Sequence, residues 1–424
     1  MKLNKIFLFT LLCIVQHSYT NTIIIKSEKD SINLNNNFFY YEDQTSNLDI
    51  NRIKIIKFEN KVDRYDKVNM GHSKSAYWFK FSIKNISDDR LYYILGIENP
   101  NLDEVDFYEF TDNILVKQVK TGEALKRSTR DISHRKFLLK SQLKPNIEYT
   151  YYIRVLNYGD ELSVPFVYQK AEPYFTKDEK RIFILGLFYG LFFMIFVFTF
   201  YLYARLKDNT YLYYSLYVAL TTLFVLGGDG LLSPILGPYL TVRVKMFFVH
   251  TGMFSLIIFT QSFYKSAGDD NFHFPWYFTF LKIISLTGAI LTFLPYPYRL
   301  SSIYIGTITA PVMYITVVLV SIILYKREYY TSFYTAAFVC SLTSVIIYLL
   351  YDYGFLANNL ITENIIKIGK TFEGIFLTLA VVERFKFIEF QDKLLIKERS
   401  EKIEAQKETL RRRHSHFHHQ ELIT

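Results

Sequence analysis

The sequence predicts a multidomain membrane protein. An N-terminal all-β jelly roll or sandwich is followed by an all-α bundle of seven transmembrane helices and a short cytoplasmic helix. Three observations predict this class. Half of the 424 residues are hydrophobic and 18% are Phe, Trp or Tyr, which is too apolar for an ordinary soluble domain. Apolar runs are short before residue 180, whereas long apolar blocks fill residues 182–382. The chain also begins with a segment typical of an export signal.

These observations divide the chain into five parts, and the charged stretch at 177–181 marks the main boundary between the two larger ones. We assign a signal peptide to 1–20, an extracytoplasmic β-sandwich domain to 21–175, a seven-transmembrane domain to 180–383, a cytoplasmic helix to 384–413 and a disordered tail to 414–424.

The N-terminal segment predicts export of the residues that follow it. Lys2 and Lys5 precede an apolar core at 6–15, which is too short to cross a bilayer as a helix. Ser18 and Thr20 supply small residues before a cleavage site at residue 21. An uncleaved membrane anchor is the alternative.

Seven apolar blocks follow, each near the length of about 20 residues that a helix needs to cross the hydrocarbon core. With the β domain outside, an odd number of spans places the C-terminus in the cytoplasm. The loop charges support this orientation only weakly, but the basic cluster at 411–413 agrees with it. We expect spans at 182–204, 211–230, 243–263, 277–296, 301–325, 332–354 and 362–383.

The region 21–175 contains several short runs in which apolar and polar side chains alternate, and residues 77–84 form the clearest of them. Turn sequences separate these runs without helical stretches between them, which predicts antiparallel strands in a sandwich or jelly roll. Cys13 lies in the export signal and Cys340 in an apolar block. We therefore expect the exported domain to depend on packing, without a disulfide.

The order of several motifs resembles a known family. In the β region these are Gly71, residues 76–81, Asn85, Glu98-Asn-Pro-Asn-Leu-Asp-Glu-Val-Asp-Phe-Tyr108, Thr121-Gly122, Arg130, residues 143–146 and residues 152–155. In the membrane half they are residues 208–217, residues 228–231 and residues 368–384. Together they resemble the bacterial seven-transmembrane receptors with diverse intracellular signalling modules, in the form with the larger type of extracellular domain.

The resemblance implies an exported domain similar to carbohydrate-binding modules and a multi-pass sensor in the bacterial cytoplasmic (inner) membrane. Members of this family normally carry an output module after the seventh span, such as a kinase or a cyclic-nucleotide enzyme. Only about forty residues follow that span here. We therefore expect either a separate cytoplasmic output protein, a kinase or cyclase, or a lost or truncated module.

Ionisable side chains inside the predicted spans are candidates for function, because a charge in hydrocarbon is costly. Lys370 and Glu373 lie near the middle of the seventh span, three residues apart and on one helical face. They either rearrange during signalling or simply neutralise each other. A retinal-binding lysine is disfavoured, because the third span offers no carboxylate as a counter-ion. Further candidates near the outward ends of spans, which could form a polar pocket open to the outside together with the pair in the seventh span or serve only as interfacial anchors, are Asp229, Arg243, Lys245, His250 and Asp352.

The β domain offers candidates for binding a small ligand. Tyr77, Trp78 and Tyr108 could stack on a sugar ring, and Arg130 and Arg154 match positions of the family motifs. The favoured alternative for Trp78 is a buried position, since a domain without disulfides needs a large core. Strand arginines also often satisfy backbone or acidic neighbours.

The cytoplasmic tail predicts a helix in which Ile396, Ile403 and Leu410 repeat every seven residues. This spacing is typical of a marginal coiled coil, and a solvated helix explains it equally well. The histidine-rich run at 414–419 is expected to be disordered, and we predict no metal site and no cofactor. The formal net charge of +9 does not indicate nucleic-acid binding, because no basic face on a folded domain is evident.

No enzyme motif is present, and we expect a receptor without enzymatic activity. Its expected partners are the lipid bilayer, a small extracytoplasmic ligand for which a carbohydrate is a candidate, a second copy of the chain and a cytoplasmic output protein. A transporter or membrane-embedded enzyme with an accessory exported domain is the alternative. Transporters often contain internal repeats, and the spans show no obvious one.

Overall fold

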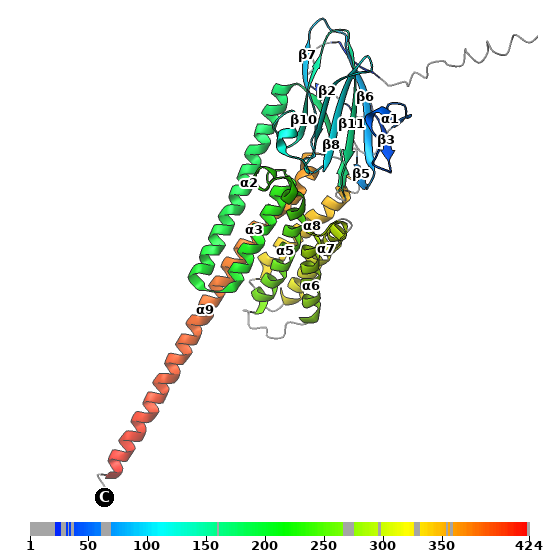
Figure 1. Cartoon of the computed structure of the whole chain (residues 1–424). Helices are drawn as coiled ribbons and strands as arrows, with labels where there is room; N and C mark the ends of the chain where they lie inside the picture. The colour runs from blue at the N-terminus through cyan, green and yellow to red at the C-terminus, as the bar shows by residue number, and fades with distance from the viewer. Residues whose placement is uncertain are drawn as a thin grey trace, which may run out of the picture.

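The computed structural model describes residues 22–26, 31–32, 34, 38–60, 69–158, 161–265, 275–295, 298–325, 331–352, 355–356 and 359–421. A β domain sits on one end of a helical bundle, and a single helix leaves the opposite end toward the C-terminus (Figure 1). A β domain followed by a helical region confirms the predicted fold class. The expected signal peptide at 1–20 lies outside the described residues.

The strands of the β domain form two main sheets. Their bounds are β1 Ile23–Ile25, β2 Ser31–Ile32, β3 Phe39–Asp43, β4 Glu59–Asn60, β5 Asn69–His72, β6 Ala76–Asn85, β7 Leu91–Ile97, β8 Glu104–Thr111, β9 Ile114–Thr121, β10 Phe137–Leu143, β11 Glu148–Leu156, β12 Glu161–Ser163 and β13 Phe166–Gln169. The larger sheet has the order β4-β3-β6-β11-β8-β9, with β1 parallel to β6. The smaller sheet has the order β10-β7-β13-β2, and β12 pairs with β5 separately.

The inward side chains of the two sheets build one apolar core. Phe79 and Ile83 of the larger sheet pack in the same cluster as Leu95 and Tyr168 of the smaller sheet. These residues alternate along their strands with residues that face outward, as a sandwich requires. The predicted sandwich is therefore confirmed, and the more specific jelly-roll topology stays a prediction.

Strand β6 is buried on both faces, where the alternation predicted one buried face. Helix α1 (Ile50–Ile53) and its neighbours cover the outer face of the larger sheet. Trp78 points to that face and packs in a second cluster with Ile53, Tyr108 and Tyr152. This local cover explains why a nearly continuous apolar run forms a central strand.

Glu109 on β8 is a buried carboxyl group that should make the stability of the domain depend on pH. Its side chain is 5% exposed, and burial raises its pKa to about 7, although Lys117 opposes the shift. An unfolded chain ionises a glutamate near pH ~4.3. Between about pH 4.3 and pH 7, Glu109 therefore loses its proton only in the unfolded state. The free energy of unfolding consequently falls as the pH rises through that window.

Glu109→Gln is expected to raise the free energy of unfolding by about 1–3 kcal/mol at pH 8 and to change it little near pH 4. Trp78 fluorescence measures unfolding of the β domain when the second tryptophan is removed by Trp276→Phe. Asp88→Asn, at an exposed carboxylate, is the matched control. An equal gain for Glu109→Gln at both pH values would show that the gain does not come from ionisation.

The helices that follow are α2 Ala171–Leu206, α3 Asn209–Gly228, α4 Ser233–Leu236, α5 Pro238–Lys265, α6 Pro275–Leu291, α7 Tyr298–Tyr325, α8 Thr331–Asp352 and α9 Leu360–Glu421. Seven long helices thus occupy the positions of the seven predicted spans. Among the described residues, five of them (α2, α3, α5, α7 and α8) are long and apolar enough to cross a membrane. Helix α6 is shorter, with 17 residues, and α9 carries charged side chains within its first turns.

Helix α2 begins at Ala171, inside the range that we assigned to the β domain. Its 36 residues correspond to about 54 Å, which exceeds the hydrocarbon thickness of about 30 Å. The first turns therefore extend beyond the membrane. There, Tyr174 packs against Ile94 and Leu138 on the outer face of the smaller sheet.

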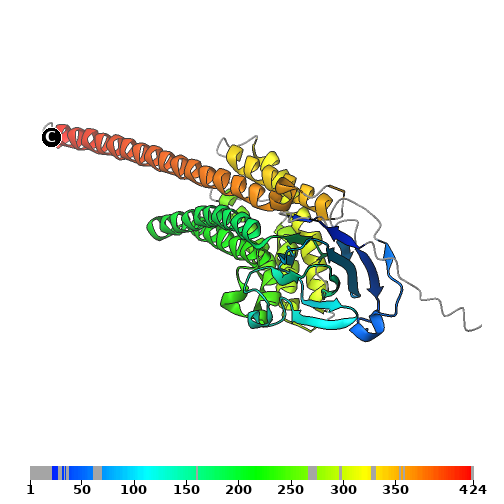
Figure 2. The same ribbon diagram turned by 90° about the horizontal axis from the view of Figure 1, so that it is seen from above.

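Helix α9 has 62 residues, which correspond to about 93 Å. Its last part projects beyond all other helices (Figures 1 and 2), and residues 391–410 are exposed. The helix continues through Glu421, past residue 414, where we predicted the start of a disordered tail. The reason is that neither Gly nor Pro interrupts this stretch.

Candidate functional site

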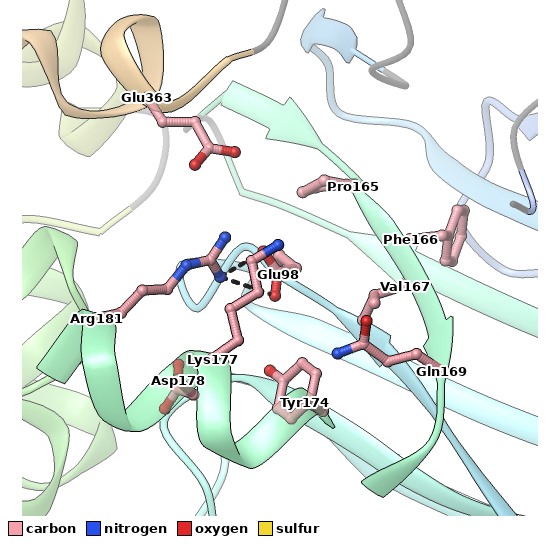
Figure 3. A pocket seen from close by; sticks show the side chains of 10 residues that line it. All are labelled: Glu98, Pro165, Phe166, Val167, Gln169, Tyr174, Lys177, Asp178, Arg181 and Glu363. Atoms are coloured by element: carbon pink, nitrogen blue, oxygen red, sulfur yellow. Dashed lines mark hydrogen bonds and ion pairs between the residues drawn. The ribbon is translucent and has the colours of Figure 1, made fainter. Parts of the chain in front are cut away.

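The β domain sits on the bundle through the loop that follows β7. The Glu98 carboxylate pairs with the Arg181 guanidinium of α2 at 2.8 and 3.1 Å (Figure 3), and with Lys136 Nζ at 2.9 Å. Burial raises the pKa of Glu98, but Lys136 and Arg181 outweigh burial and hold this pKa below its usual value. The Asn101 side-chain amide donates to the Gly228 carbonyl at the end of α3 at 2.8 Å. One loop therefore joins the β domain to two helices.

A buried ion pair forms a second connection between the β domain and the bundle. Lys245 Nζ of α5 donates to Glu123 Oε2 at 2.7 Å and to Asn101 Oδ1 at 3.1 Å. Glu123 is 1% exposed and Lys245 5%. Gly122, directly before Glu123, has a φ of +154°, and a Cβ atom there would lie 2.0 Å from the Asp103 carbonyl oxygen. A glycine is therefore needed where Glu123 turns toward the helices.

A buried polar cluster in the bundle connects four helices around Lys370 and Glu373 of α9. Lys370 Nζ donates to Glu373 Oε2 at 2.6 Å, to the Tyr217 hydroxyl of α3 at 2.7 Å and to the Tyr314 hydroxyl of α7. Glu373 also accepts hydrogen bonds from Tyr217 and from Ser341 of α8. The three donor directions of the ammonium group are thus satisfied.

This cluster lies deep in the membrane domain. Lys370 is ten residues after the start of α9, or about 15 Å along the helix axis, and it is 7% exposed. A single charge at that depth costs about 2.5–3.5 kcal/mol on insertion scales. Gly369 allows the close approach of α8, since a Cβ atom there would lie 2.1 Å from Ser344 Oγ. Pairing and tight packing together make the two charges tolerable.

Helix α9 makes polar contacts above and below the cluster as well. Lys367 Nζ pairs at 2.9 Å with Asp229 at the end of α3, and the Tyr189 hydroxyl of α2 donates to the same carboxylate at 2.6 Å. At the other end of the bundle, Arg384 pairs at 2.9 Å with Asp208 in the turn between α2 and α3. Polar contacts therefore hold α9 to the α2–α3 pair at three depths.

The structure brings four of the predicted membrane-domain candidates into these contacts. Lys370 and Glu373 form the cluster, Asp229 holds α9, and Lys245 holds the β domain. The other candidates lie elsewhere. His250 Nε2 lies 3.0 Å from Ser302 Oγ between α5 and α7, Arg243 is partly buried on α5, and the side chain of Asp352 lies outside the description.

The predicted stacking residues of the β domain are buried. Trp78 is 0% exposed and stacks on Tyr108, and Tyr77 lies in the core of the sandwich. A buried indole cannot stack on a ligand, so the structure corrects this prediction in favour of the core position. The Arg130 guanidinium bonds the carbonyl of Arg135 at 2.8 Å, and Arg154 pairs with Glu104 at 2.8 Å.

Sequence reasoning missed several residues of the site. Tyr217 and Asn101 lie inside motifs that we used for the family resemblance, and Glu123 follows another one directly, so the motifs carried the signal. Ser341 in an apolar span offered no such signal. Among the described residues, no group of three His, Cys, Asp or Glu side chains is placed to hold a metal ion.

An extracellular-type β domain that is docked on a multi-pass helical domain, with a long helix leaving its far side, defines the class of membrane receptors with a signalling role. Two family models match the chain: "7TMR-DISM extracellular 2" at residues 35–170 and "7TM diverse intracellular signalling" at residues 181–384. The chain belongs to the seven-transmembrane receptors with diverse intracellular signalling modules. No curated protein matches it.

Proposed function

We propose that this protein is a receptor of the bacterial inner membrane that senses a small extracytoplasmic ligand and transmits its binding along α9 to the cytoplasm. One observation carries the proposal. Helix α9 is continuous from the outer face, where Lys367 holds it, through the Lys370–Glu373 cluster to Arg384 and beyond. A displacement at its outer end therefore has a rigid path to the tail.

The mechanism requires two conformations with different affinities for the ligand. The buried pairs Lys245–Glu123 and Lys370–Glu373 support the existence of discrete conformations. A buried charge is stable only where its partner is in place, so intermediate arrangements are unfavourable. A shift of the β domain would act on α3 and α5 through Asn101 and Lys245. Helix α3 then contacts α9 through Tyr217.

The tail would act through other chains, without enzymatic activity of its own. Ile396, Ile403 and Leu410 are 67%, 52% and 58% exposed, and they repeat at heptad spacing. A second copy of this chain would cover that seam, so the working form is a homodimer. A separate output protein, a kinase or cyclase, would read the position of the paired helices.

The orientation is tested by cysteine accessibility in intact cells, in a background without Cys13 and Cys340. Asp112→Cys, in the exposed turn between β8 and β9, should react with a membrane-impermeant maleimide in intact cells. Ile403→Cys should react only after lysis. Equal reactivity of both cysteines in intact cells would place both ends on one side and exclude a transmembrane receptor of this topology.

A further inference from the structure

A cavity of about 220 Å³ lies where the β domain meets the outer ends of two helices (Figure 3). One wall comes from β13 and the residue before it, where Pro165 and Val167 are the apolar side chains, whereas the Phe166 ring packs against Phe38 and Phe79 in the sandwich core. The first turns of α2 form the opposite side, and Glu363 of α9 lies at the rim. Three parts of the molecule that would have to move relative to one another thus share one cavity.

Most charges around the cavity are already neutralised. Glu98 pairs with Arg181 and Lys136, as described above, and Asp178 pairs with Arg135 at 2.6 Å. Two opposite charges take part in no ion pair with another described residue, although Glu363 still interacts electrostatically with Arg181. These are Lys177 of α2 and Glu363 of α9, and both side chains are exposed.

A buried polar group adds an independent indication of a ligand. Tyr174 is 2% exposed and lines the cavity, and its hydroxyl has no hydrogen-bond partner among the described residues. A buried hydroxyl without a partner costs free energy, so such groups are usually satisfied. A ligand polar group in the cavity would satisfy it.

We propose that this cavity binds a small zwitterion of amino-acid size. Its carboxylate would pair with Lys177, its ammonium group with Glu363, and its side chain would pack against Pro165 and Val167. The volume is below the range of about 300–1,000 Å³ that drug-sized ligands need, which matches a molecule of this size. A neutral sugar would leave both charges unpaired.

Ligand binding at this site would act directly on α9. This inference rests on the proposed receptor function. Glu363 is four residues, or about 6 Å along the axis, from Lys367, which holds α9 to Asp229. A ligand that bridges Lys177 and Glu363 pulls the outer end of α9 toward α2. The ligand thereby favours one position of the helix that reaches the cytoplasm.

The experiment measures binding to the full chain in lipid nanodiscs, by calorimetry and by the shift in melting temperature. The probes are the twenty common L-amino acids, each added separately, and glucose. At least one apolar amino acid should bind and raise the melting temperature. Its analogues without the ammonium group or without the carboxylate should each bind at least about tenfold more weakly, because each loses a charge-assisted contact.

Variants then assign the binding to the cavity. Lys177→Met and Glu363→Gln should each weaken binding about tenfold or more, whereas Lys180→Met and Glu179→Gln, at exposed positions of α2 outside the cavity, should not. Tyr174→Phe should weaken binding without lowering the melting temperature of the free protein, because its hydroxyl has no partner there.

Failure of every amino acid to bind would overturn the proposal, as would binding that Lys177→Met and Glu363→Gln leave unchanged. Binding of glucose alone would assign a sugar ligand and overturn it too. None of these outcomes depends on the tail, so they are distinguishable from a failure of the receptor function, which the accessibility of Asp112→Cys and Ile403→Cys tests separately.

Discussion

Lys370→Met or Glu373→Gln alone is expected to remove most of the protein from the membrane. Lys370→Met leaves the Glu373 carboxylate without its cation, and Glu373→Gln leaves the Lys370 ammonium group without its anion. Both groups are buried, since Lys370 is 7% and Glu373 2% exposed. Breaking a buried ion pair by removing one partner costs about 3–5 kcal/mol. This is a large part of the total stability of about 5–15 kcal/mol of a typical domain.

The double variant Lys370→Met/Glu373→Gln should recover most of the lost abundance, because no unpaired charge remains and the introduced amide accepts from one of the Tyr217 and Ser341 hydroxyls through its oxygen and donates to the other through its NH2 group. The matched control is the exposed pair Lys393–Glu389 on the same helix, with side chains 71% and 50% exposed. Lys393→Met and Glu389→Gln should leave abundance unchanged. Wild-type abundance of both cluster single variants, measured by immunoblot of membranes, would refute compensation between the two charges.

Gly122→Ala is expected to undock the β domain from the bundle. Its Cβ atom would lie 2.0 Å from the Asp103 carbonyl oxygen and 2.8 Å from Glu104 Cα, and backbone cannot move aside as a flexible side chain can. The backbone amide of Glu123, which donates to the Leu102 carbonyl at 2.7 Å, would have to shift with it. Overpacking alone costs about 1–3 kcal/mol, and displacement of Glu123 from Lys245 adds the loss of a buried pair.

The measurement for Gly122→Ala is the thermal midpoint of the full chain together with limited proteolysis at the domain junction. Gly186→Ala is the control, because nothing lies within 4 Å of a Cβ atom there. Gly122→Ala should lower the midpoint by several degrees and expose the junction to protease, and Gly186→Ala should do neither. A midpoint and a cleavage pattern equal to those of Gly186→Ala would show that the loop docks without this glycine.

Features that depend on neighbouring residues in the chain could be predicted. The lengths of the apolar blocks predicted the long helices, and the alternation in β6 predicted a sandwich strand. The three-residue spacing of Lys370 and Glu373 predicted that both side chains lie on one face of the helix, close enough for contact. The ion pair at 2.6 Å confirms this. In each case helix or strand geometry relates sequence spacing directly to position in space.

Features that depend on distant residues could not be predicted. Lys245 and Glu123 are 122 positions apart, and no local pattern relates an α5 lysine to a loop glutamate. The cover over Trp78 comes from residues near α1, so strand periodicity could not tell a binding face from a second core. The start of α2 was missed because its first turns pack on the β domain and carry the charges of a loop.

In the proposed receptor, the junction between the β domain and the bundle controls the position of α9. The most direct measurement is the distance between spin labels at Arg205→Cys on α2 and Ile403→Cys on α9, in a background without Cys13 and Cys340. Labelled chains are diluted with unlabelled chains in nanodiscs, so that each distance lies within one molecule. Lys245→Met, which breaks the buried pair with Glu123, should shift the distance distribution. Lys180→Met should leave the distance distribution unchanged. When Lys370→Met/Glu373→Gln is combined with Lys245→Met, the shift caused by Lys245→Met should disappear. Superimposable distributions for wild type, Lys245→Met and Lys180→Met would contradict the claim.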